Sequence, residues 1–119
     1  FVSLQKRGPD TNAAALGEAL VDWTDELTDF AETAALIANL DLVVSVDTSV
    51  VHGAGAVGTP VWMLDRFDNC WRWGADPANP GWYEGLRVFR QVAFGDWDSV
   101  VAAVHRALSQ RASAAPSRP

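Results

Sequence analysis

Short apolar runs rich in β-branched residues recur along the chain and predict its strands. The clearest run, at 42–46, lacks polar alternation, which is typical of a strand buried on both faces. A second buried strand is predicted at 61–64 and another strand at 86–90. Shorter strand-like runs at 1–4 and 20–23 precede them. The chain is therefore predicted to contain several strands, each only a few residues long.

Stretches of helical period separate these runs. Asp29 is a suitable cap, Glu32 follows three residues later, and the next apolar positions share one helical face, which predicts a helix ending near Asn39. That face comprises Phe30, Ala34, Ile37 and Ala38. The alanine-rich residues 13–19 predict a brief helix that Gly17 weakens.

Two further helices are predicted in the second half of the chain. Residues 50–57 form a short helix that Gly58 ends. A longer amphipathic helix begins after Asp96, and its apolar stripe comprises Trp97, Val100, Val101, Val104 and Leu108. From Ser109 onward, Ala, Ser, Pro and Arg predict a disordered tail, so the expected domain is 1–108 and the tail 109–119.

The order of these elements predicts the fold class. A strand, a helix and a strand within residues 42–64 make a βαβ unit, whose two strands must run parallel. Alternating strands and helices indicate an α/β fold, a Rossmann-like parallel sheet with helices on both faces. Residues 65–86 show no clean period and hold Trp71, Trp73, Trp82 and Tyr83, which is typical of a functional loop or a partner surface.

Charge and composition narrow the range of partners. The 119 residues carry a net charge of −6, which argues against nucleic acid but leaves a small anionic ligand open. No apolar run approaches the ~20 residues of a membrane span, and the residues show no pattern of an export leader, so neither a membrane span nor export is expected. The single Cys70 fits a reducing cytoplasm, and two histidines with one cysteine make no metal site. Because Phe1 opens directly on an apolar run, we expect a piece of a longer protein.

The candidate chemistry centres on the end of the 42–46 strand. Asp47, Thr48 and Ser49 lie at the carboxyl edge of a parallel sheet, where ligands bind, and at a helix start, whose N–H groups suit phosphate. His52 lies one helical turn further on and can reach the same anion. The simpler alternative is that Asp47 or Thr48 merely caps the helix and that His52 is a core histidine whose hydrogen bonds are satisfied within the fold.

Two basic residues, Lys6 and Arg72, are weaker candidates for binding a phosphate. Lys6 follows the first strand and can meet a phosphate at the same sheet edge, although a solvated loop lysine fits the sequence equally well. Arg72 can pair with phosphate, but packing of the Trp71–Trp73 triplet as a lid is favoured.

Residues 41–64, DLVVSVDTSVVHGAGAVGTPVWML, resemble the nucleotide-sugar motif of the heptosyltransferase-like glycosyltransferases of family 9. More narrowly, the chain resembles the C-terminal domain of bacterial tetratricopeptide-repeat (TPR) proteins that carry such a module. Supporting stretches are 1–6, 27–39, 71–73, 82–83, 86–91 and 95–98. The resemblance extends over residues 1–108.

The resemblance implies half of a GT-B enzyme, in which two Rossmann-like domains enclose the active site. The C-terminal domain binds a nucleotide-diphosphate sugar, and the N-terminal domain binds the acceptor and supplies the base of a metal-independent, inverting transfer. By position, Asp47, Thr48, Ser49 and His52 line the donor diphosphate and sugar, and Lys6 adds a phosphate contact. No catalytic residue and no cofactor are expected here, so the chain alone is expected to be inactive.

Two other classes compete with this interpretation. A non-catalytic Rossmann-like interaction module would use the tryptophan-rich loop as its partner surface. A phosphoacceptor receiver domain needs paired acids after its first strand, where this chain has Gln5 and Lys6, which excludes that class. The expected partners of the chain are the N-terminal GT-B domain or TPR repeats of the full-length protein. Apolar surface left by a missing domain is expected to favour homo-oligomers.

Overall fold

A three-stranded parallel sheet forms the centre of the molecule in the computed structural model, which describes residues 1–6 and 12–116. Its strands are β3 (Val43–Val46), β4 (Val61–Asp65) and β5 (Leu86–Arg90), with β4 in the middle. Val43 is opposite Val61, which is opposite Leu86, so all three strands end at the same edge. Helix α2 (Ser49–Val57) connects β3 to β4, which confirms the predicted βαβ unit.

A second, smaller parallel sheet pairs β1 (Val2–Ser3) with β2 (Val21–Asp22). The predicted strands at 1–4 and 20–23 are therefore confirmed, although each is shorter than expected. A 3₁₀ segment over Asn12–Ala19 leads into β2, and Gly17 breaks it with a φ of 51°. A further 3₁₀ turn, Thr24–Glu26, follows β2.

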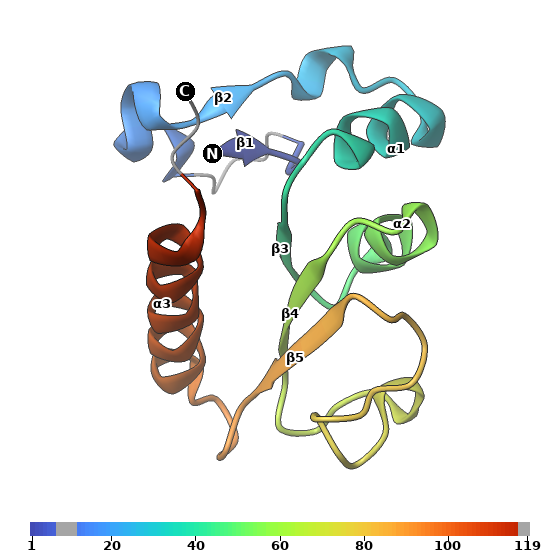
Figure 1. The fold of residues 1–119 in the computed structure, drawn as a ribbon, viewed down its shortest axis with the longest axis vertical. Helices are drawn as coiled ribbons and strands as arrows, with labels where there is room; N and C mark the ends of the chain where they lie inside the picture. Colours follow the sequence, from blue (N-terminus) through green and yellow to red (C-terminus); the bar gives the residue numbers. More distant parts are fainter. Residues whose placement is uncertain (7–11, 117–119) are drawn as a thin grey trace.

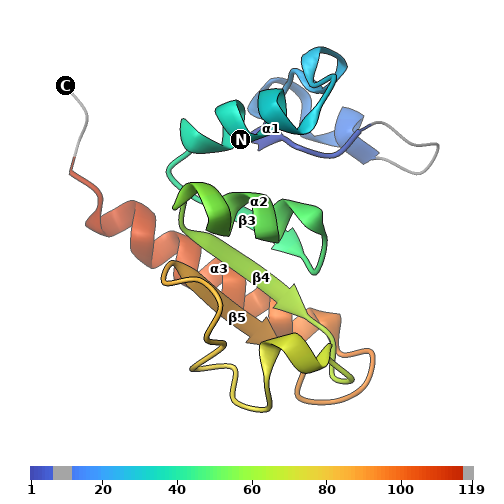
Figure 2. The same cartoon turned by 90° about the vertical axis from the view of Figure 1, so that its right-hand side faces the viewer.

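Helices cover both faces of the larger sheet, as Figures 1 and 2 show. On one face, α1 (Phe30–Ala38) and α2 pack over the strands and bury Ile37, Val51 and Met63. On the other face, α3 (Trp97–Ala114) packs against Trp62 of β4 and Phe89 of β5. This arrangement confirms the predicted α/β fold with a parallel sheet between two helical layers.

Side-chain caps fix where the helices begin and end. The Asp29 carboxylate accepts a hydrogen bond of 2.8 Å from the Glu32 amide, and Asp96 accepts one of 3.1 Å from the Ser99 amide. At the end of α2, Gly58 has a φ of 81°, in the left-handed region that favours glycine. All three boundaries agree with the sequence prediction.

The prediction that residues 42–46 are buried on both faces is wrong. Val44 and Val46 are 43% and 49% exposed. The physical reason is strand order: β3 lies at the edge of its sheet, and the buried side chains of α3 contact Trp62 and Phe89, on the other two strands.

Two helix predictions also need correction. Phe30 is 77% exposed, so only part of the predicted face of α1 is buried. The buried stripe of α3 is Val100, Val104 and Ala107, whereas Val101 is 55% exposed. The sheet and the neighbouring elements therefore cover a narrower stripe of each helix than its apolar pattern suggests.

The prediction that the disordered tail includes residues 109–114 is wrong, because α3 continues past Ser109 to Ala114. The Ser109 and Ser113 hydroxyls donate to carbonyl oxygens one turn earlier, and Arg111 donates to the Asp41 carbonyl oxygen at 3.0 Å. Residues 117–119 of the predicted tail lie outside the described residues. Within the described part of the chain, no helix is long and apolar enough to cross a bilayer.

Candidate functional site

The turn between β3 and α2 holds three of the five predicted site residues. Thr48 has extended backbone angles and occupies the cap of α2, where its hydroxyl accepts from the Val50 amide at 3.4 Å. The Ser45 hydroxyl lies 3.2 Å from the Thr48 hydroxyl. Asp47, Thr48 and Ser49 are all exposed at the carboxyl edge of the sheet. Thr48 therefore has the capping role that the simpler alternative gave it, on a turn that solvent reaches.

His52 has a partner that the sequence did not suggest. Its Nδ1 lies 2.8 Å from the Tyr83 hydroxyl, and its ring stacks on Trp73 with centroids 5.3 Å apart and planes 28° apart. Both partners come from the segment between β4 and β5, so this connection folds back over α2. The half-buried imidazole thus joins the predicted turn to the tryptophan-rich loop.

Gly55 makes room for this contact. A Cβ at Gly55 would lie within 2.6 Å of three atoms of the Tyr83 ring, closer than real Cβ atoms approach other groups. The glycines and alanines of α2 indicate a thin helix, but the sequence does not say what lies against it. The sequence feature that comes nearest to indicating this contact is Gly55 itself, three residues after His52.

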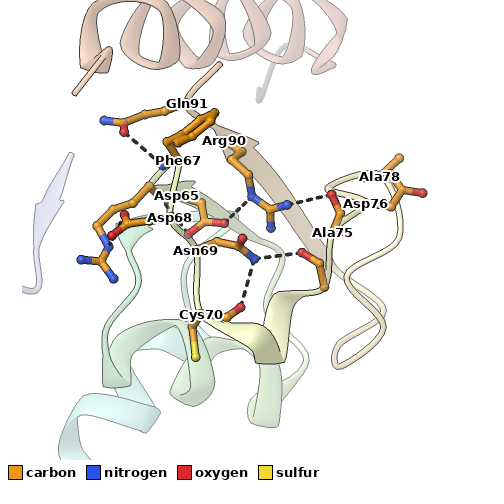
Figure 3. A network of polar contacts seen from close by, with 12 residues as sticks. Asp65, Phe67, Asp68, Asn69, Cys70, Ala75, Asp76, Ala78, Arg90 and Gln91 are labelled. Atoms are coloured by element: carbon orange, nitrogen blue, oxygen red, sulfur yellow. Dashed lines mark hydrogen bonds and ion pairs between the residues drawn. The ribbon is translucent and has the colours of Figure 1, made fainter. Parts of the chain in front are cut away.

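An ion pair joins the ends of β4 and β5, and its arginine also holds the connection between these strands (Figure 3). Arg90 Nε donates to Asp65 Oδ2 at 2.8 Å, and Arg90 Nη1 donates to the Ala75 carbonyl oxygen at 3.0 Å. The Asp65 side chain is only 2% exposed and the Arg90 side chain 11%. Sequence reasoning missed both residues, although an acid that ends a buried strand and an arginine that ends the next one are visible signals.

A buried glutamine connects two loops at the same edge of the sheet. Gln91 is 5% exposed, and its Oε1 accepts from the amides of Phe67 and Gly95 at 3.1 and 3.2 Å. One side chain therefore joins the segment after β4 to the segment before α3. Figure 3 shows this bond to Phe67 beside the Asp65–Arg90 pair.

Buried polar atoms without a partner occur in the same region. Among the described residues they are Arg72 Nε, Trp73 Nε1 and Arg90 Nη2. Trp73 is fully buried and Arg72 partly so, which agrees with the expected packing of this triplet onto the sheet. Trp71, in contrast, is 80% exposed.

Two hollows flank α2 at opposite ends. One of about 150 Å³ includes Leu4, Ser49 and Gly53 in its lining, so the end of β1 lies beside the start of α2. Lys6, two residues beyond Leu4, is exposed and is not brought into contact with the other predicted site residues. The larger hollow, about 440 Å³, is lined by Gly58, Thr59 and Gly85 among others, at the far end of α2 from Asp47.

Within the described residues, no three His, Cys, Asp or Glu side chains gather as metal ligands would.

A parallel sheet between two helical layers, with a hydroxyl-rich turn at its carboxyl edge, defines an α/β domain of the Rossmann-like class. Residues 26–68, a segment that includes α1, β3, α2 and β4, match the family model of glycosyltransferase family 9 (heptosyltransferase). The match covers Asp47, Thr48, Ser49 and His52 and confirms the resemblance found at 41–64.

A curated relative extends the similarity over most of the chain. The chain is 33% identical over 114 residues to Protein FlbA of Caulobacter vibrioides (strain ATCC 19089 / CIP 103742 / CB 15). The alignment covers 91% of this chain and 19% of FlbA, so the chain spans about a fifth of that relative's length. No solved structure matches the chain.

Proposed function

We propose that this chain is the donor-binding part of a glycosyltransferase, which moves a sugar from a nucleotide-diphosphate sugar to an acceptor. The observation that carries the proposal is the family 9 match over residues 26–68, which includes the exposed turn at the carboxyl edge of the parallel sheet. Ligands of open parallel sheets bind at this edge. The whole reaction belongs to a longer protein, of which this chain is one part.

The turn offers the groups that a diphosphate needs. The first turn of α2 carries amide N–H groups and the partial positive charge of a helix start. The Thr48 and Ser49 hydroxyls bind the phosphates, and Lys6 adds a positive charge from the end of β1. Asp47 accepts hydrogen bonds from donor hydroxyl groups, and His52 contacts the donor one turn further along α2. These local donors offset the net charge of −6.

The proposal assigns no catalytic residue to this chain. The base and the acceptor site are supplied by another domain of the full-length protein, in a GT-B arrangement, or beside TPR repeats. The reaction requires no metal, because the start of α2 and the basic side chains stabilise the departing diphosphate. The unpaired Cys70 accords with a reducing cytoplasm as the location.

The test is calorimetric titration of the chain with ADP, UDP and GDP and their sugars, without added metal. Loss of a hydrogen bond to a charged group costs about 1.5–3 kcal/mol, so Asp47→Ala and His52→Ala should each weaken binding about 10- to 100-fold. Asp25→Ala, an exposed acid elsewhere, is the control and should bind as the original chain does. If Asp47→Ala binds with unchanged affinity, the assignment of the turn is wrong.

A second candidate is a non-catalytic interaction module. The observation in its favour is the exposure of Trp71 (80%) and Trp82 (53%) on the β4–β5 connection, since exposed tryptophans are common binding anchors. If neither the folded chain nor the full-length protein binds any of the nucleotides, this alternative replaces the first proposal.

A further inference from the structure

We infer that Tyr83 is a positioning residue that fixes the tautomer and orientation of His52. In this tautomer His52 presents its Nε2–H group to an acceptor oxygen of the nucleotide-sugar substrate. This inference rests on the proposed function, because it concerns how His52 would meet the ligand. It adds Trp73 and Tyr83 of the β4–β5 connection, which lie outside the matched residues 26–68, to the working parts of the site.

The hydrogen bond between the two side chains sets the tautomer. The Tyr83 hydroxyl lies 2.8 Å from His52 Nδ1, within the normal range for such a bond. A neutral imidazole has one donor and one acceptor nitrogen, and a phenol is a donor at neutral pH. The phenol is the better donor of the two groups and the imidazole nitrogen the better acceptor, so this pairing places the Tyr83 hydrogen toward Nδ1. Nε2 then carries the proton and is the nitrogen left for a ligand.

Stacking fixes the plane of the same ring. Trp73, which is fully buried, lies against His52 at 28° between planes, whereas the Tyr83 ring meets the imidazole at 72°. One partner therefore restrains the imidazole through its face and the other through its edge. Together they hold the imidazole in one orientation before any ligand arrives, which lowers the entropic cost of binding.

Gly55 provides independent support, because it shows that α2 is built to accept the Tyr83 ring. A side chain at 55 would occupy the space of Tyr83 Cγ, Cδ1 and Cδ2. By contrast, a Cβ at Gly53 would meet only Ile37 Cδ1, at an ordinary 3.7 Å. Close approach of the phenol to His52 thus depends on a glycine at one particular place on the helix.

The chemical consequence concerns the ligand. An imidazole held with Nε2–H donates a hydrogen bond while neutral, so it needs no added proton to bind a phosphate or sugar oxygen. In the other tautomer Nε2 would be an acceptor and would repel a phosphate oxygen. Tyr83 therefore selects for ligands that present an oxygen acceptor to α2.

Nitrogen-15 NMR of the labelled chain tests the inference directly. In the original chain, His52 should show Nε2–H and an Nδ1 shift typical of a hydrogen-bond acceptor. In Tyr83→Phe, the Nδ1 shift should move to that of an unbonded nitrogen, and a fraction of the Nδ1–H tautomer should appear. Trp82→Phe, at the exposed neighbour, is the matched control and should change neither signal. An Nδ1–H tautomer in the original chain, or signals unchanged in Tyr83→Phe, would overturn the inference.

Ligand titration separates this inference from the proposed function. The nucleotide that binds the original chain should bind Tyr83→Phe about 5- to 10-fold more weakly, the cost of about one hydrogen bond. Equal affinity would overturn the role in binding. If no nucleotide binds either the chain or the full-length protein, the donor proposal fails, and the role of His52 toward the sugar donor fails with it. The NMR result still decides the tautomer in that case. Gly55→Ala, which displaces the ring but keeps the phenol, should reproduce the NMR change and so covers the case in which Tyr83→Phe does not fold.

Discussion

Replacing Gly55 by alanine should destabilise the chain, although alanine is the better helix former. In a helix interior, Gly→Ala ordinarily gains up to about 1 kcal/mol. At Gly55, however, the new methyl group would lie within 2.6 Å of the Tyr83 ring, so the ring must move by about 1 Å or more to reach an ordinary contact.

The size of the effect follows from these two opposing terms. Overpacking of this kind costs about 1–3 kcal/mol, and the helix gain offsets up to about 1 kcal/mol of it. The net change in the free energy of unfolding is therefore a loss of about 0–3 kcal/mol. Gly53→Ala provides the matched control, because its Cβ meets only Ile37 Cδ1 at 3.7 Å and the same helix gain applies. The two variants should differ by about 1–3 kcal/mol.

Urea unfolding followed by circular dichroism measures both variants under identical conditions. A lower midpoint for Gly55→Ala with an unchanged slope reports a change in stability alone. If Gly55→Ala proves as stable as Gly53→Ala, the Tyr83 ring does not lie against α2, and the reasoning about this contact is refuted.

Three further outcomes are expected. Arg90→Met leaves the buried Asp65 carboxylate without its partner and should lower the free energy of unfolding by about 3–5 kcal/mol in urea titrations; a loss below about 1 kcal/mol would contradict the ion pair's role. Asp29→Ala removes the cap of α1 and should cost about 1 kcal/mol in the same assay, whereas no change would mean that the cap is dispensable. Hydrogen bonds from Ser99 lower the pKa of Asp96, so their stabilisation is present above the ordinary carboxyl pKa and is lost as pH falls through the lowered one. Ser99→Ala should therefore raise the pKa of Asp96 in an NMR titration, and an unchanged pKa would speak against this cause.

The features predicted correctly from the sequence are those set by neighbours in the chain. The Asp29 cap with Glu32 and the left-handed Gly58 each depend on three or four consecutive residues. The βαβ unit at 42–64 follows from chain connectivity, because strands joined by one helix run parallel. These local rules are sufficient to place Asp47, Thr48 and Ser49 at the carboxyl edge of the sheet.

The features that sequence reasoning missed depend on residues distant in the chain. Exposure of Val44 depends on β3 being an edge strand, which strand order alone decides. The contact between His52 and Tyr83 joins residues 31 positions apart, and no spacing rule connects them. The Asp65–Arg90 pair likewise joins two strand ends across a long connection. One sequence does not reveal such pairings, because they arise only when the sheet assembles.

The edge position of β3 has a consequence for the colloidal behaviour of the chain. An edge strand with exposed valines offers unpaired backbone groups to other molecules, and natural proteins protect such edges with short length and charge. β3 is only four residues long, and Asp41 and Asp47 flank it. We therefore expect the charge of Asp47 to oppose intermolecular β-pairing. Its removal should increase light scattering at high protein concentration, whereas removal of the His52 imidazole should leave the scattering unchanged.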